Sequence, residues 1–329
     1  MCEISIVIPV RDEEENIGEL IQRISASIES IRKTFEIIFV TDINKDNTVG
    51  LLEEYSKKHA NIRTLKLSNG FGQHVAVMAG LDHCRGSSIV IMDGDLQDYP
   101  EDIPLLYNKL CQGYDIVYAV KEKKNDNLFR NISSRAFNSL MNNLSDIKLS
   151  NNSSMFRIIS RKGLEEVVRF REYEPSLTYI FSFINLPTTT VKVRSGTRQH
   201  GKTKYNFFKL LSFAASSLLS FSRKPLRMIS SLGLIMSVLS FIYFAVILYQ
   251  YFTLKIQILG WATIMVAITF MGGIQLLSLG VIGEYIGRIY MQTKNRPLYI
   301  IEKKYGNFGH ATSFNEASLE VGTSNLEVN

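Results

Sequence analysis

Two long stretches without a charged residue dominate the C-terminal third of this 329-residue chain. Residues 228–254 and 256–283 each exceed the roughly 20 residues that cross the hydrocarbon core of a bilayer. A buried helix of a soluble bundle would carry a polar stripe, whereas these stretches hold only scattered Ser, Thr and Gln. We therefore predict two transmembrane helices.

Basic residues lie on both outer sides of this pair. Only Lys255 separates the two stretches, whereas the outer flanks carry Arg223, Lys224 and Arg227 on one side and Arg288, Lys294, Arg296, Lys303 and Lys304 on the other. Cytosolic flanks of membrane helices are enriched in Lys and Arg. We expect a multi-pass protein of the cell (inner) membrane, with the N-terminal domain and both termini in the cytosol.

These patterns suggest four segments. Residues 1–205 form a cytosolic domain, and 206–225 are poor in polar residues, as expected of an interfacial amphipathic helix, although an ordinary core helix is the alternative. Residues 226–290 hold the two transmembrane helices. Residues 291–329 form a cytosolic tail whose end, polar from Thr312 onward, is expected to be disordered.

Strand-like and helix-like runs alternate along the N-terminal domain. Short apolar runs occupy residues 4–10, 35–40, 62–67, 89–92 and 114–119, and helical spacing of apolar residues separates them. This alternation predicts an α/β fold with a mainly parallel, doubly wound sheet. Cys2, Cys84 and Cys111 have no paired spacing, which argues against a disulfide framework or a zinc site.

Three carboxylate-rich loops follow the predicted strands, at residues 11–15, 41–47 and 93–98. Ligands of such sheets bind beyond the carboxyl ends of the strands, so these loops should converge. The G-x-G-x-x-G and G-x-x-x-x-G-K-[ST] phosphate-binding patterns are both absent from the sequence. The net charge of +6 suits a nucleic acid, a membrane surface or a phosphorylated substrate, and does not separate them.

The sharpest local signal is Asp93-Gly-Asp95-Leu-Gln97-Asp98, directly after an apolar strand. Carboxylates this close repel each other unless a cation joins them. A hard cation such as Mg²⁺ or Mn²⁺, shared with the phosphates of a diphosphate, fits this donor set. The plain alternative is a solvated turn, because Asp and Gly are common turn residues.

The sequence resembles inverting family 2 glycosyltransferases of the polyprenyl-phosphate sugar transferase type, which include dolichol-phosphate mannose synthase and bacterial undecaprenyl-phosphate glucosyl- and aminoarabinosyltransferases. The resemblance spans residues 4–301. It rests on five segments that occur in order: VIPVRDEEENI at 7–17, FGQHVAVMAGL at 71–81, DGDLQD at 93–98, GKTKY at 201–205 and GEYIGRIY at 283–290.

The resemblance implies a nucleotide-diphospho-sugar transferase (GT-A-like) domain that binds a nucleotide sugar, with a UDP sugar slightly preferred. It implies that the nucleotide pocket is lined by Pro9, Arg11, Glu13 and Asp42. Asp93, facing the ribose and diphosphate, and Gln97 would also bind the nucleotide sugar. Asp95, Gln97 and Asp93 would hold the metal. Asp93, Asp95 and Arg157 are the expected catalytic residues.

The second substrate implied by the resemblance is polyprenyl (undecaprenyl) phosphate in the bilayer. Basic residues expected to bind its phosphate are Arg130, Arg135, Arg198, Lys202 and Lys204. The guanidinium of Arg suits this role because it grips phosphate bidentately. The reaction would invert the sugar's configuration and make a lipid-linked sugar. We expect no nucleic-acid partner, and self-association is left open.

Three departures from the family pattern stand out. The D-D-G-S loop becomes Thr41-Asp42-Ile43-Asn44, and R-N-F-G becomes Asn69-Gly-Phe-Gly72. Residues 151–155 hold no carboxylate, although many relatives carry there an Asp regarded as the catalytic base. A phosphate monoester, with a second pKa near 6, is already ionised at cytosolic pH and needs no base. The departure therefore favours a phosphate acceptor over a sugar hydroxyl.

Two rival functions fit parts of the sequence. A polysaccharide synthase shares the fold but resembles proteins with more spans and a Q-x-x-R-W motif, whereas the single tryptophan here, Trp261, lies inside the second predicted span. A non-catalytic protein that binds nucleotide sugar or partners a lipid flippase would explain the altered loops. The intact Asp93–Asp98 segment favours the enzyme.

Overall fold

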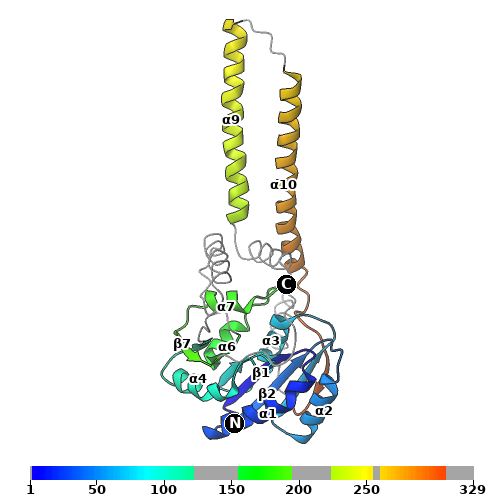
Figure 1. The fold of residues 1–329 in the computed structure, drawn as a ribbon, viewed down its shortest axis with the longest axis vertical. Helices are drawn as coiled ribbons and strands as arrows, with labels where there is room; N and C mark the ends of the chain where they lie inside the picture. Colours follow the sequence, from blue (N-terminus) through cyan, green and yellow to red (C-terminus); the bar gives the residue numbers. More distant parts are fainter. Residues whose placement is uncertain (1, 122–154, 195–223, 255–259, 309–329) are drawn as a thin grey trace, which may run out of the picture. The chain divides into compact units, whose positions relative to one another are not determined.

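The computed structural model describes residues 2–121, 155–194, 224–254 and 260–308 (Figure 1). The chain divides into two compact units. We call the first, which comprises Met1–Leu128, Leu149–Lys204 and Arg296–Asn329, the α/β unit. We call the second, which comprises Phe129–Lys148 and Tyr205–Asn295, the helical unit.

Among the described residues of the α/β unit, eight strands form one sheet in the order β7-β5-β6-β4-β1-β2-β3-β8. Their bounds are β1 Ile4–Val10, β2 Phe35–Thr41, β3 Ile62–Leu67, β4 Ser88–Ile91, β5 Ile116–Lys121, β6 Arg157–Ser160, β7 Thr188–Val193 and β8 Ile301–Tyr305. Strand β1 pairs in parallel with β2 and β4, β2 with β3, and β5 with β7. Strands β6 and β8 run antiparallel to their neighbours. The predicted α/β fold with a mainly parallel sheet is confirmed.

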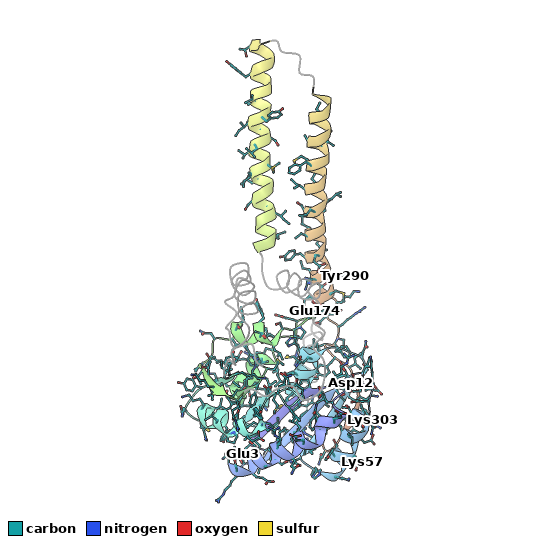
Figure 2. The ribbon with its side chains drawn as sticks, in the orientation of Figure 1. Glu3, Asp12, Lys57, Glu174, Tyr290 and Lys303 are labelled. Carbon is teal, nitrogen blue, oxygen red and sulfur yellow. The ribbon has the colours of Figure 1, made fainter. Side chains whose placement is uncertain are left out.

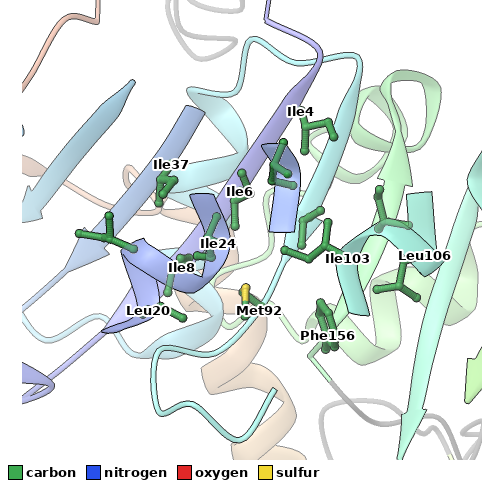
Figure 3. Packing of buried hydrophobic residues seen from close by; sticks show 14 of the residues in the cluster. Ile4, Ile6, Ile8, Leu20, Ile24, Ile37, Met92, Ile103, Leu106 and Phe156 are labelled. Atoms are coloured by element: carbon green, nitrogen blue, oxygen red, sulfur yellow. The ribbon is translucent and has the colours of Figure 1, made fainter. Parts of the chain in front are cut away.

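Helices cover both faces of the sheet. Their bounds are α1 Glu14–Ser30, α2 Thr48–Lys58, α3 Gln73–Asp82, α4 Ile103–Leu110 after the short 3₁₀ helix Pro100–Asp102, α6 Arg161–Val167 and α7 Leu177–Phe183. Alternate residues of a strand point to opposite faces. On β1, Ile6 and Ile8 pack with α1 and α4 (Figure 3), whereas Val7 packs with α3, α6 and α7.

The strands predicted at residues 4–10 and 62–67 form with those bounds, and β4 and β5 are shifted by one or two residues. Strand β8 was not anticipated. It lies in the region taken as a tail, yet it extends the sheet at β3. Its sequence, IEKKY, is largely charged and exposed, which is how edge strands avoid pairing with other chains.

Side chains on either side of β8 fix this segment to the domain. Buried Tyr299 donates a hydrogen bond to Asp82 Oδ2 at 2.7 Å. Arg171 grips the same carboxylate through two hydrogen bonds of 2.8 and 2.7 Å. The ring of Phe308 lies 4.7 Å from the guanidinium carbon of buried Arg63, which pairs with Glu36. The segment that follows the helical unit is thus part of the core.

The described part of the helical unit consists of α9, Lys224–Leu254, and α10, Trp261–Thr293. Both run beyond the uncharged stretches into their basic flanks, because Lys and Arg are good helix formers. Large apolar side chains on them are exposed, including Leu234, Phe241 and Leu276. In the described chain one stretch, Phe270–Thr293, has the length and composition to cross a membrane. Most of the predicted interfacial helix (206–223) and the end of the tail (309–329) lie outside the described residues.

Replacement of Tyr299 by Phe tests the attachment of this segment. Loss of one hydrogen bond to a buried carboxylate should lower the free energy of unfolding by about 1 to 2 kcal/mol. Thermal unfolding of the full chain in detergent measures it. Tyr114→Phe is the control, since the described residues offer its hydroxyl no hydrogen bond. An equal change in both variants would contradict a specific role for Tyr299.

Candidate active site

A cavity of about 360 Å³ opens where three neighbouring parallel strands end. The loops after β1, β2 and β4 converge there, as the strand-end rule predicts. The lining residues are Pro9, Val10, Arg11, Glu13, Val40, Asp42, Gly72, Gln73, Ala76, Asp93, Gly94 and Asp95. Six of the residues predicted for the site from the sequence therefore meet in one cavity: Pro9, Arg11, Glu13, Asp42, Asp93 and Asp95.

Close packing shapes the loop after β4. A Cβ atom on Gly94 would stand 2.7 Å from Val10 Cγ1, so only glycine lets this loop approach β1 so closely. Leu96 has a left-handed backbone with φ of 59°, which costs a bulky residue roughly 1 to 2 kcal/mol. Its buried side chain in the core offsets this cost. The turn holds Asp93 and Asp95 at the cavity wall.

Asp93 is the most electrostatically perturbed carboxylate at the site. Burial, and then the neighbouring charges of Asp98 and Asp95, raise its pKa to about 7. Gln73 Nε2 donates a hydrogen bond to Asp93 Oδ1 at 2.6 Å. The backbone N–H of Asp93 donates to Asp98 Oδ2 at 3.4 Å, and Lys121 lies 2.9 Å from the other Asp98 oxygen. Repulsion among carboxylates at the end of β4 makes this a place that favours a cation.

Gln97 supports Asp95 through its backbone. Its N–H donates a hydrogen bond to Asp95 Oδ1 at 3.2 Å, and the Gln97 side chain is not part of the cavity wall. The contact fixes the direction of the Asp95 carboxylate. The predicted role of Gln97 as a metal ligand remains a prediction.

The loops after β1 and β2 add a cation and a buried carboxylate to the cavity lining. Arg11 is exposed, and its Nε lies 4.0 Å from Oδ1 of buried Asp42. That oxygen accepts no hydrogen bond within the described part of the chain. A carboxylate only accepts hydrogen bonds, so Asp42 can receive one from an N–H group of a ligand.

Arg157, predicted as catalytic, is buried at the start of β6 and is not among the residues that line the cavity. It is 1% exposed, and its guanidinium carbon is 5.2 Å from the centre of the Tyr118 ring and 4.5 Å from that of Phe181. Burial lowers its pKa to about 10, while the charges of Tyr118 and Asp93 act in the opposite direction. The group is therefore a cation at neutral pH. It contributes positive potential near Asp93.

The remaining predicted residues cannot be placed. Arg130, Arg135, Arg198, Lys202 and Lys204 lie outside the described residues, as do positions 151–154 of the segment that lacks a carboxylate. Met155, the last position of that segment, is half-buried against the core.

Three contributors to the site were not assigned roles from the sequence. Gln73, at the start of α3, donates a hydrogen bond to Asp93. Asp98 accepts a hydrogen bond from the backbone N–H of Asp93 and forms an ion pair with Lys121. Gly72 precedes α3 with φ of 87°, a backbone that glycine adopts without strain. The FGQH segment was recognised as a motif in the sequence, but the hydrogen bond from its Gln73 to Asp93 depends on how α3 packs beside β4.

The donor set fits a hard divalent cation. Two cavity carboxylates, Asp93 and Asp95, offer oxygen ligands. The described residues contain no group of three or more His, Cys, Asp or Glu residues arranged for a metal. Mg²⁺ and Mn²⁺ sites of this sparse kind are completed by water and substrate phosphates, which matches a wall with few protein ligands.

Comparison with known proteins gives consistent matches. The profile of glycosyl transferase family 2 matches residues 5–168, and that of the GtrB C-terminal hairpin matches residues 224–289. An uncharacterized glycosyltransferase, YkcC of Bacillus subtilis, is 37% identical over 92% of this chain and 94% of its own length. A bactoprenol glucosyl transferase from the SfII prophage of Shigella flexneri is 34% identical over 92% and 98%. An undecaprenyl-phosphate 4-deoxy-4-formamido-L-arabinose transferase of Pseudomonas fluorescens is 31% identical over 92% and 90%.

The raised pKa of Asp93 predicts pH-dependent cation binding. Below about pH 7 the carboxyl holds a proton that a cation must displace, so Mn²⁺ affinity should fall by up to about tenfold per pH unit below 7 and level off above it. Titration calorimetry of the full chain with Mn²⁺ between pH 5.5 and 8.5 measures this. Asp93→Asn should bind Mn²⁺ more weakly and lose the pH dependence. An affinity that does not change over this range would contradict the assignment.

Proposed function

The chain belongs to glycosyltransferase family 2, and we propose that it transfers a sugar from a nucleotide diphosphate sugar to polyprenyl phosphate. The proposal rests above all on one observation: Asp93 and Asp95 share a single cavity with Arg11 and Asp42. That arrangement supports a diphosphate beside Asp93 and Asp95 and a nucleoside beside Arg11 and Asp42. The named relatives act on undecaprenyl phosphate and bactoprenol, which supports the same acceptor class here.

We assign the two ends of the cavity to different parts of the donor. Asp42 and Arg11 contact the nucleoside, where the carboxylate of Asp42 complements a ring N–H such as that of uracil. Asp93 and Asp95, with Gln97, would hold a Mg²⁺ or Mn²⁺ ion that the donor's diphosphate also binds. The bound cation would offset the negative charge that builds on the departing nucleoside diphosphate. Preference for a UDP sugar is part of this proposal.

The transfer step is a single displacement. An oxygen of the lipid phosphate forms a bond to the anomeric carbon while the bond from that carbon to the diphosphate oxygen breaks. The bonding electrons leave with the nucleoside diphosphate. A phosphate dianion becomes a diester monoanion as the nucleoside diphosphate gains one negative charge, so charge balances without proton transfer. Attack opposite the leaving group inverts the anomeric configuration.

The lack of a carboxylate at residues 151–155 fits this acceptor. A sugar hydroxyl would need a general base, which typically contributes 10² to 10⁴ in rate. A phosphate monoester is mostly ionised at neutral pH because its second pKa is near 6. Buried Arg157 adds positive potential on the side of Asp93. An ionised phosphate acceptor and the positive potential of Arg157 therefore account for the attack without a catalytic base at residues 151–155.

The C-terminal hairpin explains access to a lipid that cannot leave the bilayer. We propose that residues 228–254 and 256–283 span the inner membrane, with residues 1–205 and the tail in the cytosol, as the basic flanks predict. Residues 206–225 would lie in the interface. Arg130, Arg135, Arg198, Lys202 and Lys204 are our candidates for the lipid phosphate. Positive side chains near a membrane also attract anionic headgroups.

The direct test incubates the full chain in detergent with undecaprenyl phosphate, Mn²⁺ and a panel of nucleotide sugars. We expect one donor to give a lipid product heavier by one sugar unit in mass spectrometry, with release of nucleoside diphosphate. Asp95→Ala should lower the rate at least about a hundredfold, as loss of a group that stabilises the leaving-group charge does.

Glu101→Ala is the matched carboxylate control. Glu101 pairs with Arg23 at 2.8 Å and is absent from the cavity wall, so transfer should be unchanged. Nucleotide binding without lipid product from any donor would contradict the transferase and favour the non-catalytic reading. A growing polymer would instead favour a polysaccharide synthase.

A further inference from the structure

Side chains lock the loops after β1 and β2 to each other. The backbone N–H of Asp12 donates a hydrogen bond to Asn44 Oδ1 at 2.9 Å, and the N–H of Lys45 donates to Asp12 Oδ1 at 2.6 Å. Asn44 Nδ2 donates in turn to the carbonyl of Asp42 at 2.9 Å and to Thr41 Oγ1 at 2.5 Å. We call Asp12 and Asn44 the loop clasp.

The clasp holds an unusual backbone conformation. Asp12 has φ of 55°, in the left-handed region that few residues other than Gly, Asn and Asp adopt readily. This kink lies between Arg11 and Glu13, which both line the cavity, while Asp12 itself is exposed (Figure 2). On the other loop, Asn44 grips the carbonyl of Asp42, another cavity residue. Each clasp residue therefore lies one or two positions from the residues that it orders.

Neighbouring contacts have a simpler explanation. Glu14 and Asp46 also join the loops, through hydrogen bonds from Glu14 N to Asp46 Oδ2 at 3.1 Å and from Asn47 N to Glu14 Oε2 at 2.9 Å. These carboxylates lie at the starts of α1 and α2, where acidic groups and acceptors satisfy free N–H groups. Asp12 lies two residues before α1 and Asn44 four residues before α2, so neither contact is explained by a helix terminus.

We propose that Asp12 and Asn44 are positioning residues for the nucleoside end of the donor. They hold Arg11 and Glu13 of one loop against Asp42 of the other, and neither of them contacts the ligand. This inference rests on the proposed function, in which the β1 and β2 loops receive the nucleoside. Transfer chemistry belongs to the β4 loop, which the clasp does not touch. Loss of the clasp should therefore weaken nucleotide binding and leave the saturated rate unchanged.

Two variants open the clasp and a third preserves it. Asn44→Ala removes the side-chain acceptor and donor. Asp12→Gly keeps the left-handed backbone accessible but removes the acceptor for Lys45. Asp12→Asn retains both the Oδ1 acceptor and a residue that tolerates positive φ. Asn44→Ser takes the place of Asn44→Ala if the latter does not fold.

The measurement is calorimetric binding of UDP and GDP, with Mn²⁺, to the full chain in detergent. For the nucleotide that wild type binds more tightly, we expect Asn44→Ala and Asp12→Gly to raise Kd about tenfold, the effect of losing one or two hydrogen bonds. Asp12→Asn should stay within about twofold. In the transfer assay the KM of the donor should rise similarly while kcat stays within about twofold.

Ser160→Ala controls for general loss of stability. Ser160 accepts a hydrogen bond from Gly163 N at 3.0 Å and donates one to Asp115 Oδ1 at 2.6 Å, and it is not in the cavity wall. Its loss should lower the melting temperature without changing Kd. Unchanged Kd in both clasp variants, an equal rise in Ser160→Ala, or a loss confined to kcat would overturn the inference while the proposed function stands. If wild type binds neither nucleotide, the proposed function fails and this inference with it.

Discussion

Repulsion among the carboxylates that follow β4 is the constraint on which the site depends. Asp93 is held beside Asp95 and Asp98, and its pKa rises to about 7 as a result of burial and these charges. The protein offsets this repulsion only in part, through the ion pair of Lys121 with Asp98 and the hydrogen bond from Gln73 to Asp93. A divalent cation bound there would offset the repulsion between these carboxylates, and we propose that it also binds the donor's diphosphate. The fold places this loop at the end of β4, beside β1, whose other neighbour is β2, so the same cavity also contains Arg11 and Asp42, which we propose contact the nucleoside.

Much of the fold could be predicted because its central strands carry their signal locally. Strand β1, ISIVIPV, is an almost unbroken apolar run, and β3, IRTLKL, carries apolar residues among polar ones; the bounds of both were found from the sequence. Strand β7, TTTVKV, is polar and largely exposed, and β8 is charged, so neither shows such a run. Their positions are set by strands distant in sequence, because β7 pairs with β5 and β8 pairs with β3. A tail was therefore expected where Tyr299 and Phe308 complete the core.

The residues of the site also fall into those that could be predicted from the sequence and those that could not. Arg11, Asp42, Asp93 and Asp95 could be predicted because residues that follow parallel strands must meet at one edge of the sheet. Gln73 could not, since its contact with Asp93 depends on the packing of α3. Arg157 was predicted as catalytic from the resemblance, and that role stays a prediction; its contacts with the rings of Tyr118 and Phe181 are a property of the folded core. The Thr41–Asn44 loop, which departs from the family pattern, supplies in Asn44 the side chain that accepts a hydrogen bond from Asp12 N.

The account's central claim is a displacement on an anomeric carbon by a phosphate that needs no protein base. Phosphorus and proton NMR of the purified lipid product tests it most directly. The account predicts a phosphodiester signal that replaces the monoester in equal amount with released nucleoside diphosphate, and an anomeric configuration opposite to that of the donor. A retained configuration, or free sugar with the lipid phosphate unchanged, would contradict it.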